Sequence, residues 1–241
     1  MMKAKMQNKK TNIIIQCRFS SFRLPGKAMY PLCGIPMLTF LIRRLSWGLE
    51  HEYFRIIVAT SDSPEDNPVE AWAHQEGVAC IRGNLENVLA RYMKTIRAFP
   101  SVLNVRVTAD NPLTCPDIIN SCVRKMENEI LDYIQSYGYP LGAGVDVFTT
   151  DLLHRIQDMA KTPEDFEHLN NVVLHRPRMF KTGKLTAPQE LLKPQLRMTV
   201  DTPEDFERMS AALCTLDICQ RPAWEVPLKK AVQLFEQIKR N

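Results

Sequence analysis

The chain has 241 residues, 45% of them hydrophobic and 24% charged, so it can bury roughly 70% of its unfolded surface, which excludes collagen, a coiled coil and general disorder. Its 31 basic residues exceed its 27 acidic residues by four, and the four lysines among residues 1–10 account for that excess. The rest of the chain is electrically neutral, so we expect no nucleic-acid partner, although a local basic cluster could hold a small anion.

The first ten residues are polar and basic and lack the apolar segment of a secretory signal. We expect a flexible basic tail over 1–10, followed by a single domain over 11–241 with insertions at about 135–195. The longest uncharged stretch, 28–42, is shorter than a membrane helix and contains two prolines. The sequence therefore predicts no membrane-spanning segment.

Strand-like and helix-like segments alternate through the first half of the chain. Short β-branched or apolar runs predict strands, and apolar residues at helical spacing predict helices. Strands are expected at 12–17, 54–60, 78–81 and 103–108, helices at 36–48, 64–76, 85–99 and 116–129, and a further apolar stretch at 130–134. This alternation implies right-handed crossovers and a mostly parallel sheet with helices on both faces.

The second half is less regular. Glycine and proline residues interrupt 138–144, before a short apolar run at 145–148. An extended segment is expected at 179–187, and a last strand at 196–200 leads into a helix that begins near Pro203. We interpret the irregular part as insertions that could cover a site or pair with another subunit.

One hexapeptide, Thr-Pro-Glu-Asp-Phe-Glu, occurs at 162–167 and again at 202–207. The residues after each copy differ, so the match is no solenoid repeat. Threonine can cap a helix, proline fits its first position, and the acidic residues favour its positive N-terminal end. Both copies therefore predict helix starts, and the segment 63–66 is expected to start a helix in the same way.

The seven cysteines are scattered and form no Cys-x-x-Cys pair. This pattern argues against a disulfide framework and against a zinc ribbon. We interpret them as buried thiols of a cytoplasmic protein.

The segment that follows the first strand carries a dense basic cluster. Arg18, Arg23 and Lys27 lie within ten residues, together with two serines and a Pro-Gly turn. In open α/β sheets, ligands bind beyond the carboxyl ends of the strands, and cations with loop amides suit a polyphosphate there. A solvated basic loop is the alternative. The phosphate-binding pattern Gly-x₄-Gly-Lys-Ser/Thr is absent, because Ser21 stands in place of its first glycine.

Two aspartates follow apolar segments at the same predicted edge of the sheet. Asp110 comes after the strand at 103–108, and Asp201 comes after the strand expected at 196–200. Each alone could cap the helix that follows it. Beside a polyphosphate site, the pair favours Mg²⁺, which binds one or two carboxylates together with phosphate oxygens and water.

At these residues the sequence resembles the cytidylyltransferases that make CMP-activated acidic sugars, in particular the branch typified by the spore coat polysaccharide biosynthesis protein F. The resemblance covers about residues 12–210 and is carried by segments 14–27, 58–61, 82–83, 107–113 and 199–205. It implies a Rossmann-like, three-layer α/β fold of the nucleotide-diphospho-sugar transferase type. It also implies a homodimer that binds CTP, Mg²⁺ and a small acidic sugar-like acceptor.

Several positions of this chain match functional positions of the family. The resemblance implies that the triphosphate is bound by Arg18, Ser21, Arg23 and Lys27. It implies that the nucleoside is contacted by Arg82 and Thr108, and that the metal is bound by Asp110 and Asp201. It implies an acceptor contact for Asp146, whereas His168 is a candidate general base near the acceptor, with a packed or surface histidine as the alternative. The chain departs from the family pattern at Ser20, Phe22 and 166–171.

The reaction expected from this site is attack of an acceptor oxygen on the α-phosphorus of CTP, with release of pyrophosphate. Lys27 and Arg18 are the candidate catalytic residues, because positioning and charge stabilisation carry most of such a transfer. Two alternatives remain open at this point. One is a nucleotide-sugar-dependent glycosyltransferase, although the chain has no Asp-x-Asp motif. The other is a paralogue that binds nucleotide without turnover.

Overall fold

The computed structural model describes residues 10–21, 23–216 and 221–238. The tail expected over 1–10 lies outside the described residues, apart from Lys10. None of the helices within those ranges combines the length and the hydrophobicity needed to cross a lipid bilayer.

Strands and helices alternate along the chain, as the sequence predicts. The strands are β1 (Thr11–Gln16), β2 (Pro31–Leu32), β3 (Ile35–Pro36), β4 (Phe54–Ser61), β5 (Ala79–Gly83), β6 (Leu103–Thr108), β7 (Tyr133–Tyr137), β8 (Asp146–Thr149) and β9 (Thr182–Thr186). The α-helices are α2 (Met37–Gly48), α3 (Asn67–Gln75), α4 (Val88–Ala98), α5 (Pro116–Glu129), α6 (Thr150–Met159), α7 (Pro163–Glu167), α8 (Asn171–His175), α9 (Pro203–Cys214) and α10 (Leu228–Ile238). Short 3-10 segments include η1 (Lys27–Met29) and η2 (Pro64–Asp66).

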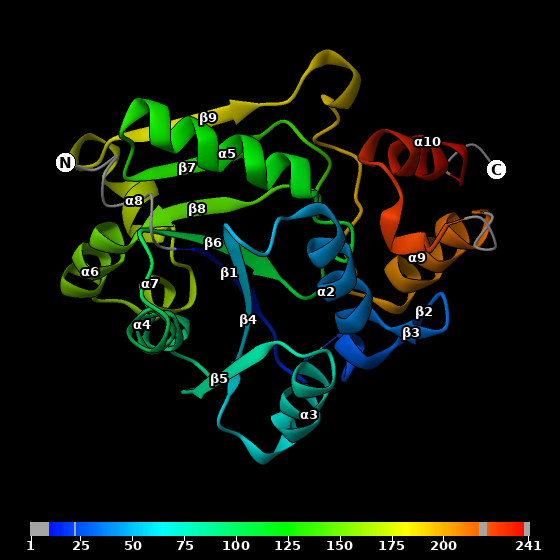
Figure 1. Cartoon of the computed structure of the whole chain (residues 1–241), viewed down its shortest axis with the longest axis horizontal. Coiled ribbons are helices and arrows are strands. Elements are labelled where there is room, and N and C mark those ends of the chain that lie inside the picture. Colours follow the sequence, from blue (N-terminus) through cyan, green and yellow to red (C-terminus); the bar gives the residue numbers. More distant parts are fainter. Residues whose placement is uncertain (1–9, 22, 217–220, 239–241) are drawn as a thin grey trace.

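Seven of the described strands form one sheet in the order β5-β4-β1-β6-β8-β7-β9, and β2 and β3 form a separate antiparallel pair (Figure 1). Strands β5, β4, β1 and β6 are parallel, and β9 is parallel to β7. Strand β8 is antiparallel to both of its neighbours. The predicted α/β architecture with a mostly parallel sheet is confirmed.

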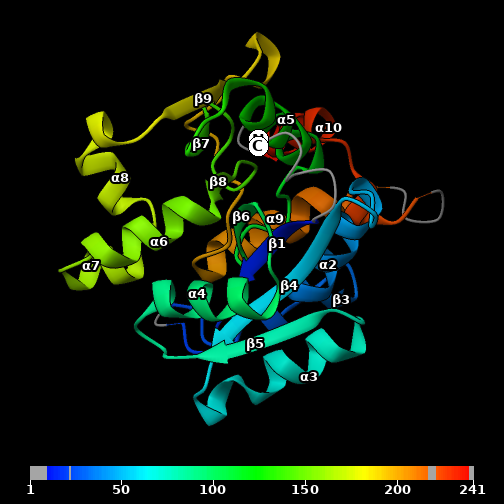
Figure 2. The ribbon, with the colours of Figure 1, turned by 60° about the vertical axis from the view of Figure 1, so that its left-hand side comes forward.

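The central strand β1 shows why helices cover both faces. Successive side chains of a strand point to opposite faces, and Ile13, Ile14 and Ile15 are all fully buried. Ile13 and Ile15 belong to the apolar cluster with α2 and α5, whereas Ile14 belongs to the cluster with α4 and α6. In Figure 2, α4, α6, α7 and α8 lie on one side of the sheet and α2, α5, α9 and α10 on the other. The chain thus forms three layers.

The strand expected at 196–200 is absent from the described sheet, so this prediction was wrong. The segment is extended, but its amides bond to loops: Met198 N to Leu141 O at 2.8 Å and Val200 N to Asp110 O at 2.8 Å. Gly142 permits this approach, because a Cβ there would lie 2.7 Å from the carbonyl oxygen of Met198. The segment therefore ties the loop after β6 to the start of α9.

Two of the three expected helix starts are confirmed. Thr162 and Thr202 each accept a hydrogen bond from the backbone of the aspartate three residues later and form capping boxes. The third expected start is confirmed in part: η2 begins with Pro64 at its first position and leads directly into α3, but the side chain of Ser63 makes no capping hydrogen bond among the described residues. The carboxylate of Asp66 turns instead toward the loop that follows β1.

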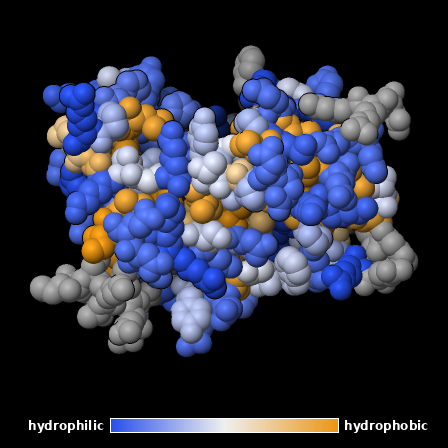
Figure 3. Space-filling model, turned by 90° about the horizontal axis from the view of Figure 1, so that it is seen from above, coloured by the Kyte–Doolittle hydropathy of each residue, from blue (hydrophilic) through white to orange (hydrophobic). Residues whose placement is uncertain are grey.

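The face over α5, β9 and α10 is mainly hydrophilic, with hydrophobic side chains in several groups between the polar ones (Figure 3).

The six described cysteines are free thiols. Cys17, Cys115 and Cys122 are buried as predicted, whereas Cys214 is exposed.

The segment 135–195, expected to hold insertions, forms most of β7, all of β8 and β9, and helices α6, α7 and α8.

Candidate active site

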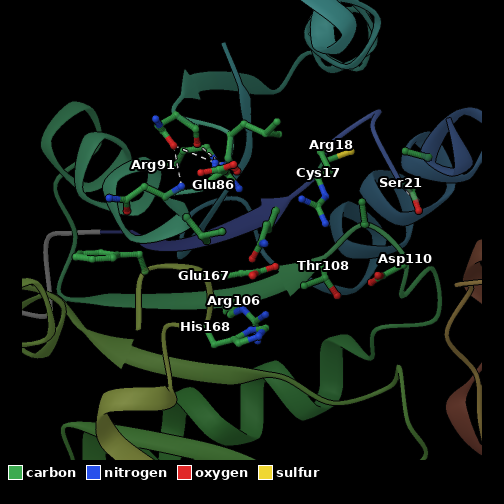
Figure 4. Close-up of a pocket in the computed structure, with 18 of the residues that line it drawn as sticks. Cys17, Arg18, Ser21, Glu86, Arg91, Arg106, Thr108, Asp110, Glu167 and His168 are labelled. Carbon is green, nitrogen blue, oxygen red and sulfur yellow. Dashed lines mark hydrogen bonds between the residues drawn. The ribbon is translucent and has the colours of Figure 1, made fainter. Parts of the chain in front are cut away.

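A cavity of about 920 Å³ opens at the carboxyl ends of β1 and β6. Figure 4 shows Arg18 and Ser21 on the loop after β1, near Thr108 and Asp110 at the end of β6. The cavity wall contains eight of the residues singled out from the sequence: Arg18, Ser21, Arg23, Lys27, Thr108, Asp110, His168 and Asp201. The structure thus brings together residues from four distant parts of the chain.

The loop between β1 and η1 folds back on itself. The amide of Cys17 donates to the carbonyl of Ala59 at 3.1 Å, which extends the pairing of β1 with β4 beyond the sheet. The amide of Gly26 donates to the carbonyl of Phe19 at 2.9 Å, with Gly26 at φ +69°. A Cβ at Gly26 would lie 3.0 Å from the ring of Phe19, so a side chain there would disturb the turn. This closed loop presents Arg18, Ser21 and Arg23 to the cavity.

Lys27 joins the two aspartates predicted to bind metal. Its ammonium lies 3.1 Å from Oδ2 of Asp110 and 2.9 Å from Oδ1 of Asp201. The same nitrogen donates to the carbonyl of Val200 at 2.8 Å. All three donors of the ammonium are therefore used, and three oxygen atoms converge on one point.

Asp201 is held by arginines as well as by Lys27. Its Oδ2 accepts from Arg197 at 2.6 Å, and its Oδ1 lies 3.3 Å from the guanidinium of Arg23. Burial acts to raise the pKa of Asp201, but Lys27, Arg197 and Arg23 outweigh it and hold that pKa below its ordinary value. Arg197 is itself fixed by Asp205, to which it donates twice at 3.0 Å. Asp201 is thus ionised and oriented.

The point now held by the ammonium suits a magnesium ion by its donor set. Two carboxylates and a backbone carbonyl are hard oxygen ligands, and Mg²⁺ commonly takes one or two carboxylates and completes its shell with phosphate and water. The described residues contain no group of three or more His, Cys, Asp and Glu side chains that could hold a metal alone.

Arg91 is a wall residue that the sequence did not single out. It lies on α4, is only 2% exposed, and donates to the carbonyls of Asn84 and Leu85. Its Nε has no partner among the described residues. Arg91 fixes the loop 84–87, which forms the opposite wall of the cavity (Figure 4). An arginine among the apolar residues of the helix expected at 85–99 was the sequence signal that could have identified Arg91.

Arg106 is the second residue that was missed. It lies on β6, opposite Asp146 on β8, and its guanidinium lies 3.5 Å from Oδ2 of that residue. Asp146 also accepts from the hydroxyl of Tyr133 at 2.7 Å, and burial raises the pKa of Asp146 above its ordinary value. A charged residue between Val105 and Val107 in a buried strand was the signal for Arg106.

A second hollow of about 230 Å³ adjoins the cavity and shares Arg106 and Thr108 with it. Asp146 lines this hollow and not the main cavity. Gln135, Ser136 and Tyr139 supply further polar groups to the hollow. Within the described residues, the Nε of Arg106 is buried without a partner.

Arg82 does not line the main cavity. Its guanidinium donates to the carbonyls of Ser61 and Ser63 at 2.9 and 2.7 Å. It also forms an ion pair with Glu70 at 2.8 Å. In this arrangement Arg82 ties β5 to the end of β4 and to α3.

His168 follows the last residue of α7, and its amide donates to the carbonyl of Glu164 at 2.8 Å. Its side chain is exposed in the cavity wall beside Glu167 (Figure 4). The capping box of Thr162 sets the direction of this short helix. His168 is therefore accessible to a molecule in the cavity.

The charges of the cavity suit a metal-bound polyphosphate. Five cationic side chains line it, Arg18, Arg23, Lys27, Arg91 and Arg106, against the carboxylates of Glu86, Asp110, Glu167 and Asp201. Phosphate oxygens pair well with guanidinium groups, and loop amides add further donors. The arrangement can position a phosphoryl group and stabilise the charge that develops during its transfer.

Comparison with known proteins identifies relatives of this chain. The profile of the family described as Cytidylyltransferase matches residues 12–240. The Spore coat polysaccharide biosynthesis protein SpsF of Bacillus subtilis is 31% identical over 231 residues, which cover 95% of this chain and 93% of that protein. A cytidylyltransferase structure from Leptospira borgpetersenii superimposes with a TM-score of 0.85 and 26% identity, over 97% of this chain and 95% of the other.

A more distant match shares the fold. The structure of CMP:2-keto-3-deoxy-manno-octonic acid synthetase complexed with CTP superimposes with a TM-score of 0.65 and 19% identity, over 86% of this chain and 99% of the other.

Proposed function

This chain belongs to the cytidylyltransferase family, a family of nucleotidyltransferases, and we propose that it transfers CMP from CTP to an acidic sugar or a related acceptor and releases pyrophosphate. We further propose that the product serves the biosynthesis of a surface polysaccharide or glycan. The description of the family, Cytidylyltransferase, and the name of one relative, Spore coat polysaccharide biosynthesis protein SpsF, support this proposal. Family membership also favours this reading over a glycosyltransferase or a binder without turnover.

The observation that carries the proposal is the convergence of Asp110 and Asp201 on the ammonium of Lys27, beside Arg18 and Arg23 in one cavity. Two carboxylates that reach a common point can share one divalent cation. The guanidinium groups next to them can pair with the phosphates that such a cation also binds. A triphosphate with its metal satisfies both halves of this arrangement.

Each residue of the loop has a place in the proposed reaction. Arg18 and Arg23 would hold the β- and γ-phosphates, since their forked donors match phosphate oxygens in pairs. Ser21 would donate to the same oxygens. Lys27 would turn from the aspartates to the α-phosphate, where its positive charge would stabilise the negative charge that develops as the acceptor oxygen attacks.

The size of this effect follows from Coulomb's law. A unit charge pair about 4 Å apart contributes about 4 kcal/mol at an effective dielectric constant near 20. That energy corresponds to roughly three decades of rate if it is realised only in the transition state.

We propose Mg²⁺ as the cation that Asp110 and Asp201 would hold. When bound, it would neutralise phosphate charge and make pyrophosphate a better leaving group. The role of the two aspartates is to keep ionised oxygens at the edge of the sheet, which Arg197 and Arg23 support by holding Asp201 in place.

The nucleoside is proposed to lie against Thr108 and the loop 84–87. Thr108 is in the wall at the end of β6, and Arg91 fixes the loop by two hydrogen bonds to its carbonyls. Arg82, expected from the family to contact the nucleoside, would reach it only by releasing Glu70 and the two carbonyls that it now holds.

The acceptor is proposed to enter from the second hollow. Arg106 lies between that hollow and the cavity and could pair with an acidic group of the acceptor. Asp146 is proposed to orient Arg106 there, and His168, in the wall of the main cavity, is proposed to take the proton of the attacking oxygen. A pH–rate profile of His168→Gln that equals the wild-type profile would remove His168 from this role.

A homodimer and a cytoplasmic location remain predictions. Light scattering on the purified protein tests the first, and cell fractionation tests the second.

The reaction itself is tested by incubating the protein with CTP, Mg²⁺ and a cell extract and searching for CMP conjugates by mass spectrometry. Lys27→Ala and Asp201→Asn should each lower turnover at least about 100-fold, the usual loss for one electrostatic stabiliser. Lys125→Ala, on α5 outside the cavity, should retain activity. Pyrophosphate release by Lys27→Ala or Asp201→Asn at the wild-type rate would reject the assignment.

A further inference from the structure

Asp66 is a buried carboxylate that lies outside the cavity wall. It ends the 3-10 segment η2, directly after β4, and is 0% exposed. Its Oδ2 accepts from the hydroxyl of Thr60 and from the amide of Ser61, both at 2.8 Å. Its Oδ1 accepts from the amide of Phe19 at 2.6 Å. One oxygen therefore serves its own strand and the other serves the loop after β1.

The amide of Phe19 connects that loop, through the carboxylate of Asp66, to the end of β4. Before it, Cys17 is tied to Ala59 by the continuation of the sheet pairing. After it, the carbonyl of Phe19 accepts from Gly26, and this bond closes the loop. Arg18 lies between the two anchored residues, so the direction of its side chain depends on both bonds.

A buried carboxylate normally needs a cation beside it, because burial of an unpaired charge is costly. Asp66 forms no ion pair within the described part of the chain; amide and hydroxyl donors surround it instead. Burial acts to raise the pKa of Asp66, but hydrogen bonds from Ser61, Phe19 and Thr60 outweigh it and hold that pKa below its ordinary value. The group stays ionised, and an ionised acceptor makes the stronger hydrogen bonds.

We propose that Asp66 is a positioning residue for triphosphate binding: by holding the amide of Phe19, it sets the loop that aims Arg18 and Ser21 into the cavity. This inference rests on the proposed function. Asp66 does not touch the ligand itself. Asp66 orders the loop before the ligand binds, so the entropy cost of ordering the loop does not reduce the affinity for the phosphates.

The test uses Asp66→Asn and Thr60→Val in the full chain. An amide has one acceptor oxygen, and that oxygen satisfies two donors only where it faces Thr60 and Ser61. Its NH₂ group then lies against the amide of Phe19, so Asp66→Asn should release Phe19. Thr60→Val removes a hydrogen bond from the same carboxylate but leaves the bond to Phe19, which makes it the matched control. The two readouts are hydrogen exchange at the amide of Phe19 and the affinity for CTP with Mg²⁺.

In the protein without ligand, the amide of Phe19 should exchange at least about 100-fold more slowly than in an unstructured peptide, and Asp66→Asn should remove this protection. The dissociation constant for CTP should rise at least about tenfold in Asp66→Asn, equal to about 1.4 kcal/mol, and less than about threefold in Thr60→Val. Turnover at saturating CTP should change less than affinity does.

Three results would overturn the inference. The first is fast exchange of Phe19 in the wild-type protein, a result that needs no variant to fold. The second is unchanged protection in folded Asp66→Asn. The third is lost protection with unchanged CTP affinity. Wild-type protein that binds no CTP would reject the proposed function, and this inference with it, whereas CTP binding that Asp66→Asn leaves intact rejects only this inference.

Discussion

The ammonium of Lys27 occupies the point on which Asp110 and Asp201 converge, so it competes with a divalent cation for that point. We predict that Lys27→Met binds Mn²⁺ more tightly than the wild-type protein when no nucleotide is present. Methionine keeps an unbranched side chain of similar length but has neither the charge nor the three hydrogen-bond donors of the ammonium. In the wild-type protein, nucleotide phosphates would have to draw the ammonium away before the metal binds well.

The expected size comes from the two distances, 3.1 and 2.9 Å. A unit charge pair about 3 Å apart contributes about 5 kcal/mol at an effective dielectric constant near 20. Water screens part of this energy, because the side chains of Asp110 and Asp201 are 27% and 19% exposed. A net gain of only about 1.4 kcal/mol already tightens binding tenfold. We therefore expect at least about a tenfold decrease in the Mn²⁺ dissociation constant.

Titration calorimetry near neutral pH, with the free Mn²⁺ followed by electron paramagnetic resonance, measures this directly. Adding Asp201→Asn to Lys27→Met should abolish the gain, since one of the two carboxylates is then lost. Lys125→Met, which removes a lysine from α5, should bind Mn²⁺ as the wild type does. If folded Lys27→Met binds Mn²⁺ no more tightly than the wild-type protein, Lys27 does not block a metal site and the reasoning fails.

Three further predictions concern stability. Ile130 follows α5 in the left-handed region at φ +50° and is 53% exposed, so Ile130→Gly should raise the free energy of unfolding by about 1 kcal/mol; an unchanged or lower melting temperature would contradict this. Arg44 is 1% exposed and donates to three backbone carbonyls, so Arg44→Met should lower the free energy of unfolding by about 3 kcal/mol in urea titrations. Arg124→Met, at an exposed position of α5, should change it little. Burial acts to raise the pKa of Asp205, but hydrogen bonds from Arg197 and the backbone lower it to about 2. Because this pKa is lowered in the folded state, ionised Asp205 stabilises the fold above the ordinary pKa, and this stabilisation is lost on acidification. The free energy of unfolding should therefore fall by about 2 kcal/mol between about pH 4 and 2. Asp205→Asn should make this decrease shallower, and an equally steep decrease in the variant would refute the assignment.

Much of the fold could be predicted because its signals are local. The bounds of β6 and α5 agree with those expected from the sequence, since apolar periodicity and a proline at the first helical turn act over a few residues. The capping boxes of Thr162 and Thr202 were predictable for the same reason. The mostly parallel sheet could be predicted because strands that alternate with helices are joined by right-handed crossovers.

The segment 196–200 shows where such signals end. Its apolar residues read as a strand, but whether an extended segment joins a sheet depends on the neighbour that its amides meet. Here they meet Leu141 and Asp110, which lie far away in the sequence. Arg91 and Arg106 were missed for a related reason: periodicity predicts which face of an element is buried, not that a cation on that face borders a cavity.

Local patterns along the chain were enough to predict the alternation of strands and helices, the basic loop after the first strand and the two aspartates that follow extended segments. The packing of distant elements places Lys27 between those aspartates, pairs Arg82 with groups outside the cavity and lets Asp66 hold the loop through Phe19. Propensity and periodicity depend on neighbours in sequence. Hydrogen bonds and ion pairs of this kind join groups from different elements, and their formation depends on how those elements pack.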